Sequence, residues 1–484
     1  MNLARRSYST CGVCLLAAGL TAVLPLAPSS VNLAPQAIRL LSSSPANDLV
    51  GLVVGGTGTP IPQESVKFPN YVEQANDLFI QRILPGAVSQ GVFTPEGGSP
   101  IYTGVKSLPF DTSFAQGAAM LKIDIENSVA AGNTVAVYGE SQSSTISGMV
   151  MPELEHDGVA ADAVKFVLVG NPSNPDGGLL ERFAPLSLPA LGITFDGATP
   201  PDSIYHTDIY TQEYDGFADF PKFTLNALAD INAVLGLLFV HPTYRVLTET
   251  QLDHAIALPT TADYNGNTTY YMVPMADDQV LPLLRLFEGI PLVGKPLVDL
   301  INPVLTQIVN LGYDNPQNQG WDVGQANVPT TFGLFPSIGQ VMTAIDNMGP
   351  ALQQGFEAFA NDLTHPAATA DSSETAAALT NLFGLGGAGL SLPNLTDVVN
   401  GLTAAFSQAY SILLPTADIA TSLAVSMPAY DLNLFAQNLL SDPLQAIVGP
   451  LAADTGLITL AAGIELMTVE QTLTTIAGDV AGMF

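Results

Sequence analysis

The sequence of 484 residues predicts an α/β fold with a mostly parallel central sheet, followed by a mainly helical C-terminal region. From about residue 49 to residue 320, short runs of apolar and β-branched residues alternate with segments of helical periodicity. Several of the short runs are apolar throughout, which is typical of strands buried on both faces of a sheet. Beyond residue 330 the composition shifts to Ala, Leu, Thr and Gly, and the chain has no Lys or Arg after Lys295.

Hydrophobic patterns and the glycines that end them predict the first strands and helices. The run "LVGLVVGGTG" at 49–58 is continuously apolar and ends in glycines, so it predicts a buried strand. Helical periodicity predicts a helix over 71–84, and "IYTGVKSL" at 101–108 predicts a strand. The segment 112–132 predicts a second helix, which its final glycine closes.

The next elements continue the alternation. The strand "TVAVYG" at 134–139 is followed at once by a helix over 143–155, and "AVKFVLVGNP" at 163–172 is another buried strand. A further strand is expected at 204–214 and a helix at 223–240. These elements belong to a single α/β domain.

The domain boundaries follow from composition. A Pro- and Gly-rich interval at 174–203 interrupts the alternation and is expected to be a lid or a substrate loop. The strand "TTYYMV" at 268–273 comes last, so the α/β domain is expected to cover 45–330. The remainder, 331–484, is interpreted as a separate, acidic, Ala- and Leu-rich helical region.

The first 37 residues have the order of a secretory signal. Arg5 and Arg6 precede an apolar core, and small residues and prolines follow. An uncleaved membrane anchor is the alternative, because the apolar run approaches spanning length. Export to the cell envelope or the medium is therefore expected. Both cysteines, Cys11 and Cys14, lie in this segment, so a processed chain would have no disulfide.

Charge and motifs exclude several classes of function. The net charge of −31 repels phosphate backbones, so no nucleic-acid partner is expected. The five histidines do not approach one another at metal-ligand spacing, so no metal is expected. The motif "GLGGAG" at 384–389 follows a helical run instead of a buried strand, so no dinucleotide cofactor is expected. The sequence predicts no particular oligomeric state.

The stretch "YGESQSS" places Ser141 between a buried strand and a helix. A nucleophilic serine on such a sharp turn needs small residues two positions before and after it, and Gly139 and Ser143 occupy those positions. The usual second glycine is replaced by Ser143. A helix N-cap is the alternative role for Ser141.

A serine nucleophile needs a histidine as base and an acid to orient it. Asp215 directly follows the strand at 204–214, and His241 directly follows the helix at 223–240, so the order is Ser, Asp, His. Asp219 is the alternative acid, although it could instead cap the next helix. His254 is the alternative base.

The negative charge that develops on the substrate oxygen also needs hydrogen-bond donors. The backbone N–H of Gln142, the residue after the candidate nucleophile, is one candidate. The loop "GGTGTPIP" after the first strand is the expected source of the other, with Thr57, Gly58 and Thr59 as candidates.

The sequence resembles the mycobacterial PE-PPE domain proteins, a branch of the serine α/β-hydrolases near cutinases and lipases. The segments that carry the resemblance span about residues 50 to 330 and are "VVGGTGTPIP", "VAVYGESQSS", "FVLVGNPSNPDGG", "EYDGFADFP", "FVHPTY" and "TTYYMVP". The resemblance implies an α/β-hydrolase fold with the family's serine, acid and histidine at Ser141, Asp215 and His241. It implies hydrolysis of acyl esters or, as in some relatives, acyl transfer to a trehalose-based glycolipid. The signal-like segment stands where the family has a PE or PPE helical module.

The sequence therefore predicts an exported serine esterase or lipase-like enzyme that acts on acyl-ester or lipid substrates and associates with the cell envelope peripherally. Two alternatives stay open. An acyltransferase would use the same three residues with a sugar hydroxyl in place of water. A catalytically silent envelope or binding protein would retain the fold without the activity.

Overall fold

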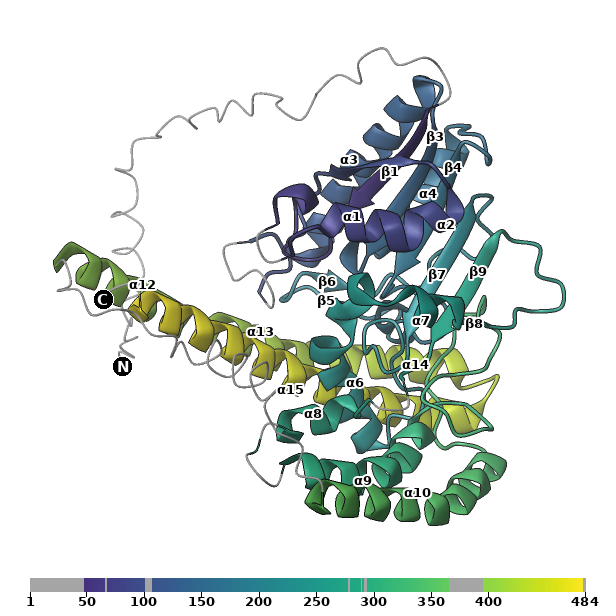
Figure 1. Cartoon of the computed structure of the whole chain (residues 1–484), viewed down its shortest axis with the longest axis vertical. Coiled ribbons are helices and arrows are strands. Elements are labelled where there is room, and N and C mark those ends of the chain that lie inside the picture. The colour runs from purple at the N-terminus through teal and green to yellow at the C-terminus, as the bar shows by residue number, and fades with distance from the viewer. Residues whose placement is uncertain are drawn as a thin grey trace, which may run out of the picture. The chain divides into compact units, whose positions relative to one another are not determined.

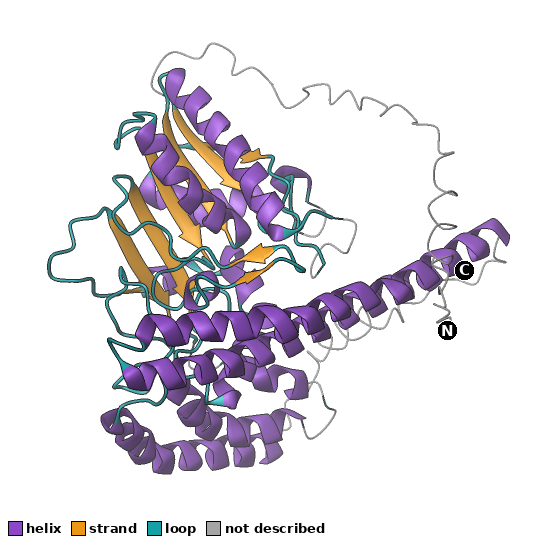
Figure 2. Cartoon of the chain, turned by 180° about the vertical axis from the view of Figure 1, so that it is seen from behind, coloured by secondary structure: helices purple, strands orange, loops and turns teal. Residues whose placement is uncertain are grey.

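The computed structural model describes residues 48–65, 68–100, 107–276, 279–288, 290, 294–364 and 395–481. The described residues belong to one unit, in which a sheet with helices on both faces is extended by long C-terminal helices (Figures 1 and 2). The expected signal segment 1–37 lies outside the described residues, as does most of the strand expected at 101–108.

In the described part of the chain the central sheet has seven strands, most of which run parallel. They are β1 (Leu49–Val54), β2 (Val88–Val92), β3 (Thr134–Glu140), β4 (Val164–Val169), β7 (His206–Gln212), β8 (Ile256–Ala257) and β9 (Thr268–Val273). Their order is β2-β1-β3-β4-β7-β9-β8, and only β8 runs antiparallel to its neighbour. Because parallel strands end at the same edge, the loops after β1, β3, β4 and β7 gather there.

The sheet is covered on both faces because successive side chains of a strand point to opposite sides. On one face, Val135 and Val137 of β3 share a core with α3 (Phe110–Ala130) and α4 (Gln142–His156). On the other, Ala136 and Tyr138 pack on the continuous helical segment of α1 (Tyr71–Ala75), a π-helical turn and α2 (Gln81–Ile83). These helices correspond to those expected at 71–84, 112–132 and 143–155.

The interval between β4 and β7 has structure of its own. It contains the short helix α5 (Leu179–Arg182) and a two-stranded antiparallel hairpin of β5 (Ser187–Leu188) and β6 (Ile193–Thr194). Asp111, at the start of α3, accepts hydrogen bonds from the Thr194 backbone N–H and hydroxyl at 2.7 and 2.9 Å. These two hydrogen bonds therefore hold the β5–β6 hairpin against α3.

The remaining helices follow β7. Those within the α/β region are α6 (Ala227–Phe239), α7 (Glu249–Asp253), α8 (Pro282–Glu288) and α9 (Gly294–Val309). Those beyond it are α10 (Ile338–Thr364), α12 (Leu395–Ser411), α13 (Leu413–Thr421), α14 (Met427–Asn438) and α15 (Pro443–Ala481). The helix expected at 223–240 corresponds to α6, and the predicted helical character of the C-terminal region is confirmed.

The C-terminal helices are not a separate unit, in contrast to the division expected at residue 331. Helix α15 packs on α6, where a side chain at Gly463 would come within 2.4 Å of Val234, so glycine allows the close approach. The Thr224 hydroxyl donates to the Ala452 carbonyl of α15. Residues 403–438 and 443–473 are also long and apolar enough to span a membrane, but the second range is partly buried here against the α/β core.

Candidate active site

Ser141 sits on a strained turn between β3 and α4. Its backbone has φ 59° and ψ −119°, a conformation that residues with a side chain rarely adopt. A Cβ atom at Gly139 would lie 2.8 Å from the Ser143 carbonyl oxygen, so the strand and helix can approach this closely only with glycine there. Ser141 makes no side-chain cap hydrogen bond to α4, which argues against the role of an N-cap.

Ser143, which replaces the usual glycine, closes the turn through its hydroxyl. The Glu140 backbone N–H donates to Ser143 Oγ at 2.8 Å, and Ser143 Oγ lies 3.1 Å from the Glu140 carbonyl oxygen. Its side chain is fully buried. The departure from glycine is therefore accommodated by hydrogen bonds within the turn.

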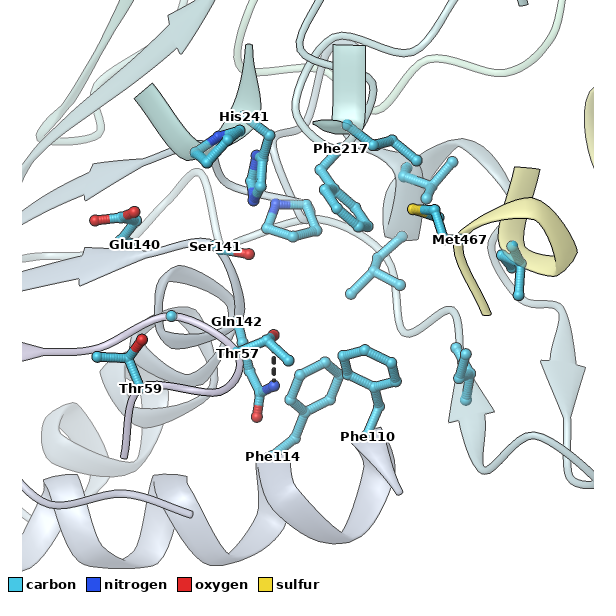
Figure 3. A pocket seen from close by; sticks show the side chains of 18 of the residues that line it. Thr57, Thr59, Phe110, Phe114, Glu140, Ser141, Gln142, Phe217, His241 and Met467 are labelled. Carbon is cyan, nitrogen blue, oxygen red and sulfur yellow. Dashed lines mark hydrogen bonds between the residues drawn. The ribbon is translucent and has the colours of Figure 1, made fainter. Parts of the chain in front are cut away.

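A cavity of about 160 Å³ opens at Ser141. Figure 3 shows the Ser141 hydroxyl pointing into this cavity, with His241 on one side and Thr57 and Gln142 on the other. Phe110, Phe114, Phe217 and other apolar side chains form most of the remaining wall. The site therefore combines a few polar groups with a large apolar surface, as small-molecule sites commonly do.

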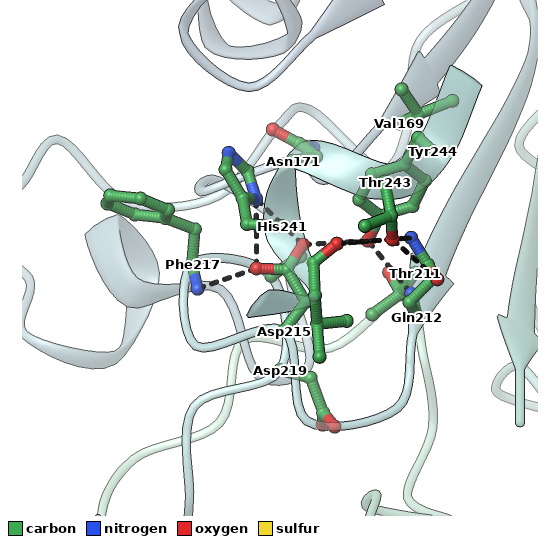
Figure 4. Close-up of polar contacts among 12 residues, drawn as sticks. Val169, Asn171, Thr211, Gln212, Asp215, Phe217, Asp219, His241, Thr243 and Tyr244 are labelled. Carbon is green, nitrogen blue, oxygen red and sulfur yellow. Dashed lines mark hydrogen bonds and ion pairs between the residues drawn. The ribbon is translucent and has the colours of Figure 1, made fainter. Parts of the chain in front are cut away.

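The structure brings His241 against Asp215. His241 Nδ1 lies 2.9 Å from Asp215 Oδ1 and 2.8 Å from Oδ2, and the carboxylate is fully buried (Figure 4). His241 Nε2 is buried and has no hydrogen-bond partner among the described residues. The imidazole thus has one nitrogen held by a carboxylate and the other available to a group in the cavity.

Two further groups hold the Asp215 carboxylate. The Tyr244 hydroxyl donates to Oδ2 at 2.7 Å and accepts from the Gln212 backbone N–H at 2.8 Å, and the Phe217 N–H donates to Oδ1 at 3.0 Å. Burial and the neighbouring Asp215 charge raise the pKa of Tyr244 well above its usual value, so the hydroxyl stays protonated and donates. The Asp215 carboxylate is therefore hydrogen-bonded to His241, to the Tyr244 hydroxyl and to the Phe217 backbone N–H.

The alternative residues lie elsewhere. Asp219 points away from His241 in Figure 4, and its Oδ2 accepts from the Tyr214 backbone N–H at 2.9 Å. Burial raises the pKa of Asp219 well above its usual value. His254 is exposed and hydrogen-bonds the Thr250 carbonyl at 2.7 Å. His156 and His206 are exposed as well, and His365 lies outside the described residues.

The Gln142 side chain links the turn to the loop after β1. Its Nε2 donates to Thr57 Oγ1 and to the Gly97 carbonyl, each at 2.9 Å, while its Oε1 accepts from Ser113 at 2.6 Å. As the first residue of α4, Gln142 has a backbone N–H without a partner within the helix. Both Thr57 and Gln142 line the cavity.

Gly58, the other expected oxyanion donor of this loop, has its backbone N–H in use. Its backbone N–H donates to the Glu96 carbonyl at 2.8 Å, and its φ of +81° suits glycine. The N–H is therefore engaged within the protein, so Gly58 shapes the loop instead of offering an oxyanion donor. Thr59 is buried at the cavity wall.

Glu140, for which the sequence indicates no role, is at the centre of a buried polar network. Its Oε2 accepts from Arg245 Nε at 2.7 Å, Tyr138 at 2.8 Å and Tyr71 at 2.9 Å. The Arg245 guanidinium also lies over the rings of Phe68 and Tyr71, at 4.4 and 4.2 Å. Burial is the largest single influence and lowers the pKa of Arg245, but the Glu140 carboxylate together with Tyr71 and Tyr138 outweighs it, so the pKa is raised.

Residues far along the chain complete the cavity. Leu179, Leu180, Leu188 and other residues of the 174–203 interval line it, together with a group from α15. The α15 residues are Leu460, Ile464 and Met467. The sequence indicates a lid or substrate loop at 174–203, but it has no signal that this interval and α15 meet at the site, because their meeting depends on tertiary packing.

Within the part of the chain that the structure describes, no group of three or more His, Cys, Asp or Glu side chains could hold a metal ion.

Comparison with known proteins places the chain in a family. Residues 85–314 match the PE-PPE domain. The chain is 39% identical to the PPE family protein PPE28 of Mycobacterium tuberculosis over 488 residues, covering 94% of this chain and 71% of that protein. It is 41% identical to esterase PE16 of the same organism, covering 68% of this chain and 60% of that protein.

More distant similarities also exist. The chain is 27% identical to the diacyltrehalose acyltransferase Chp2 of M. tuberculosis, covering 44% of this chain and 60% of that protein. A solved structure of a cutinase-like protein from Cryptococcus sp. aligns at 22% identity and a TM-score of 0.25, covering 37% of this chain and 81% of that chain. On the strength of the match to PPE28 and the domain match, the chain belongs to the PE-PPE domain family.

Proposed function

We propose that this chain is a serine esterase that hydrolyses acyl esters through Ser141, His241 and Asp215. One observation carries the proposal. The His241 imidazole turns Nδ1 to the buried Asp215 carboxylate and leaves Nε2 unpartnered among the described residues, and it borders the cavity into which the Ser141 hydroxyl points. This arrangement supports a serine nucleophile, a histidine base and an aspartate that orients the base.

The proposed reaction has two halves. His241 Nε2 takes the proton of the Ser141 hydroxyl as Ser141 Oγ attacks the ester carbonyl carbon, and the same proton then passes to the departing alcohol. An acyl-serine ester remains. Water, deprotonated by His241, then attacks this ester and releases the free acid with the serine restored. Asp215 holds the imidazole tautomer and stabilises the imidazolium in both halves.

The oxyanion would be held by Gln142 and Thr57. The backbone N–H at the start of α4 points out of the helix and adds the favourable end of the helix dipole. The Gln142 side chain donates to Thr57 Oγ1, so the Thr57 hydroxyl hydrogen is not used in this bond. It can be donated to another acceptor, such as the oxyanion. Two donors from different elements would thus meet the developing charge. Gly58, with its N–H engaged, is not part of this proposal.

Labelling with a fluorophosphonate probe tests the proposal. The wild-type chain should be labelled, and Ser141→Ala should not. Asp215→Asn should lower the labelling rate and kcat by about 10⁴, whereas the matched change Asp219→Asn, at the buried carboxyl that does not contact His241, should have a much smaller effect. Absence of labelling in the correctly folded wild-type chain would favour a silent binding protein and contradict the proposal.

Acyl transfer with the same residues is the second candidate, and the similarity to the diacyltrehalose acyltransferase favours it. In that case a sugar hydroxyl would attack the acyl-serine in place of water. The two reactions separate when one acyl donor is supplied with and without trehalose, and released free acid and acylated trehalose are both measured. Export to the cell envelope stays a prediction from the signal-like segment 1–37.

A further inference from the structure

The cavity at Ser141 is polar only at one end. Thr57, Gln142 and His241 lie at that end, and the opposite wall is built from aliphatic and aromatic side chains of the 174–203 interval and of helices α3, α6 and α15. Apolar cavities of about this size stay dry and bind small hydrocarbons. An acyl group whose carbonyl carbon meets Ser141 would therefore extend its carbons towards the apolar wall.

A second, smaller cavity of about 30 Å³ adjoins the first. The two cavities share the lining residues Leu188, Leu460 and Ile464. Apart from Ser422, the residues of the second cavity are apolar, and most come from the helices after residue 413. The second cavity thus continues away from Ser141, between the β5–β6 hairpin and the C-terminal helices.

Helix α15 borders both cavities. Leu457, Leu460, Ala461 and Ile464 recur at spacings of three and four residues, so they lie on one face of the helix. Leu460 and Ile464 border both cavities, while Leu457 and Ala461 border only the second. One face of α15 therefore follows the whole path away from Ser141.

We propose that the passage between Leu188, Leu460 and Ile464 admits the distal carbons of an acyl chain into the second cavity, so that α15 determines which chain lengths the site accepts. This inference rests on the proposed function and names its substrate class as esters of medium- and long-chain acids. It assigns to the C-terminal helices a binding role that the α/β domain alone could not provide. The driving force is burial of methylene groups, each of which contributes about fourfold to binding.

Substitution on α15 tests the proposal. Ala461→Phe fills the second cavity, and Ala462→Phe, the matched control, adds the same side chain at the next residue, which is exposed. The measured quantity is the ratio of kcat/KM for 4-nitrophenyl dodecanoate to that for 4-nitrophenyl butanoate. Ala461→Phe should lower this ratio about tenfold, since one to two methylenes lose their place, and Ala462→Phe should keep the wild-type ratio.

An unchanged ratio in Ala461→Phe, or an equal fall for both esters, would overturn the proposal. Ile464→Ala provides a second variant in the opposite direction, because it widens the passage and should raise the ratio. If the ratio in Ile464→Ala stays at or below the wild-type value, this result also contradicts the proposal.

Binding measurements separate this inference from the proposed function. Dodecanoate and butanoate are titrated into Ser141→Ala by calorimetry, where no hydrolysis is needed. Dodecanoate should bind more tightly than butanoate, and adding Ala461→Phe should weaken dodecanoate about tenfold. If dodecanoate binds in this way but the wild-type chain hydrolyses no ester, the acyl site stands and the proposed function is wrong. If esters are hydrolysed while Ala461→Phe leaves dodecanoate binding unchanged, the acyl site is wrong.

Discussion

Arg245 Nε donates to Glu140 Oε2 at 2.7 Å, and this buried ion pair joins the two segments that carry the candidate nucleophile and base. Glu140 directly precedes Ser141, and Arg245 lies in the same short helical segment as His241, which extends from His241 to Val246. The pair therefore fixes the loop of the base against the end of β3. Glu140 and Arg245 are positioning residues in this arrangement.

Breaking this pair should lower both stability and activity. Glu140→Gln leaves the Arg245 guanidinium buried without its carboxylate, which should reduce the free energy of unfolding by about 3–5 kcal/mol. A shift of His241 relative to Ser141 should lower kcat by about tenfold to a hundredfold. Urea denaturation and hydrolysis of 4-nitrophenyl butanoate measure the two effects.

The double variant Glu140→Gln/Arg245→Met separates positioning from folding. Replacing both members of a buried ion pair is often neutral for stability, so most of the free energy of unfolding should return. The value of kcat should stay low because the link between the two segments is still missing. Recovery of kcat together with stability would show that the pair acts through folding alone.

Removing the Tyr244 hydroxyl should weaken the hold on Asp215. In Tyr244→Phe the carboxylate loses a 2.7 Å hydrogen bond and the buried Gln212 N–H loses its acceptor. The free energy of unfolding should fall by about 1–3 kcal/mol, and kcat about tenfold. Tyr205→Phe is the matched control, because the Tyr205 hydroxyl donates to the Val159 carbonyl outside the site. Equal losses of kcat in both variants would contradict a role for Tyr244 at Asp215.

The order of elements predicts that Ser141, Asp215 and His241 lie at one edge of the sheet, and the structure brings His241 against Asp215 and beside the cavity at Ser141. Parallel strands end at one edge of a sheet, so residues that follow β3 and β7 come together there. Ser141 and Asp215 both follow strands in this way, and α6 returns the chain to the same edge before His241. The parallel sheet itself was predictable because β1, β3 and β4 are apolar on both faces.

Other features depend on packing and have no local signal. Strand β2 (VSQGV) escaped prediction because it lies at the edge of the sheet and alternates between exposed and half-buried residues. The two-residue strand β8 is too short to show a pattern. The ion pair of Glu140 with Arg245 and the contribution of α15 to the cavity join segments far apart in the chain. The sequence does contain one signal for the ion pair, because a glutamate such as Glu140 at the end of a buried strand requires a buried partner.

Removing the Thr57 hydroxyl should lower the rate of the chemical step. Thr57→Val keeps the shape of the side chain but removes the proposed oxyanion donor, so kcat should fall by about 10²–10³ with a small change in KM. Thr59→Val makes the same change two residues further along the cavity wall, where no hydrogen bond to Gln142 is made, and its effect on kcat should be at least tenfold smaller. A larger effect at Thr59 would assign the donor to that residue instead.

Asp230 should make the protein less stable as the pH rises. This residue of α6 is fully buried, and neither carboxylate oxygen has a hydrogen-bond partner in the described part of the chain. Burial raises the pKa of Asp230 from 3.8 to about 8. Between these two values the folded state holds a proton that the unfolded state has lost, so the free energy of unfolding falls with rising pH, by up to about 1.4 kcal/mol per pH unit.

Asp230→Asn isolates this contribution, because the amide does not titrate. The free energy of unfolding of the variant minus that of the wild type should increase between pH 5 and pH 8, by up to about 4 kcal/mol. Urea denaturation at several pH values measures the difference. Asp263→Asn, at an exposed loop position, is the matched control and should follow the wild-type curve. A difference that stays constant with pH in Asp230→Asn would show that the Asp230 carboxyl ionises in the folded chain as it does in the unfolded one.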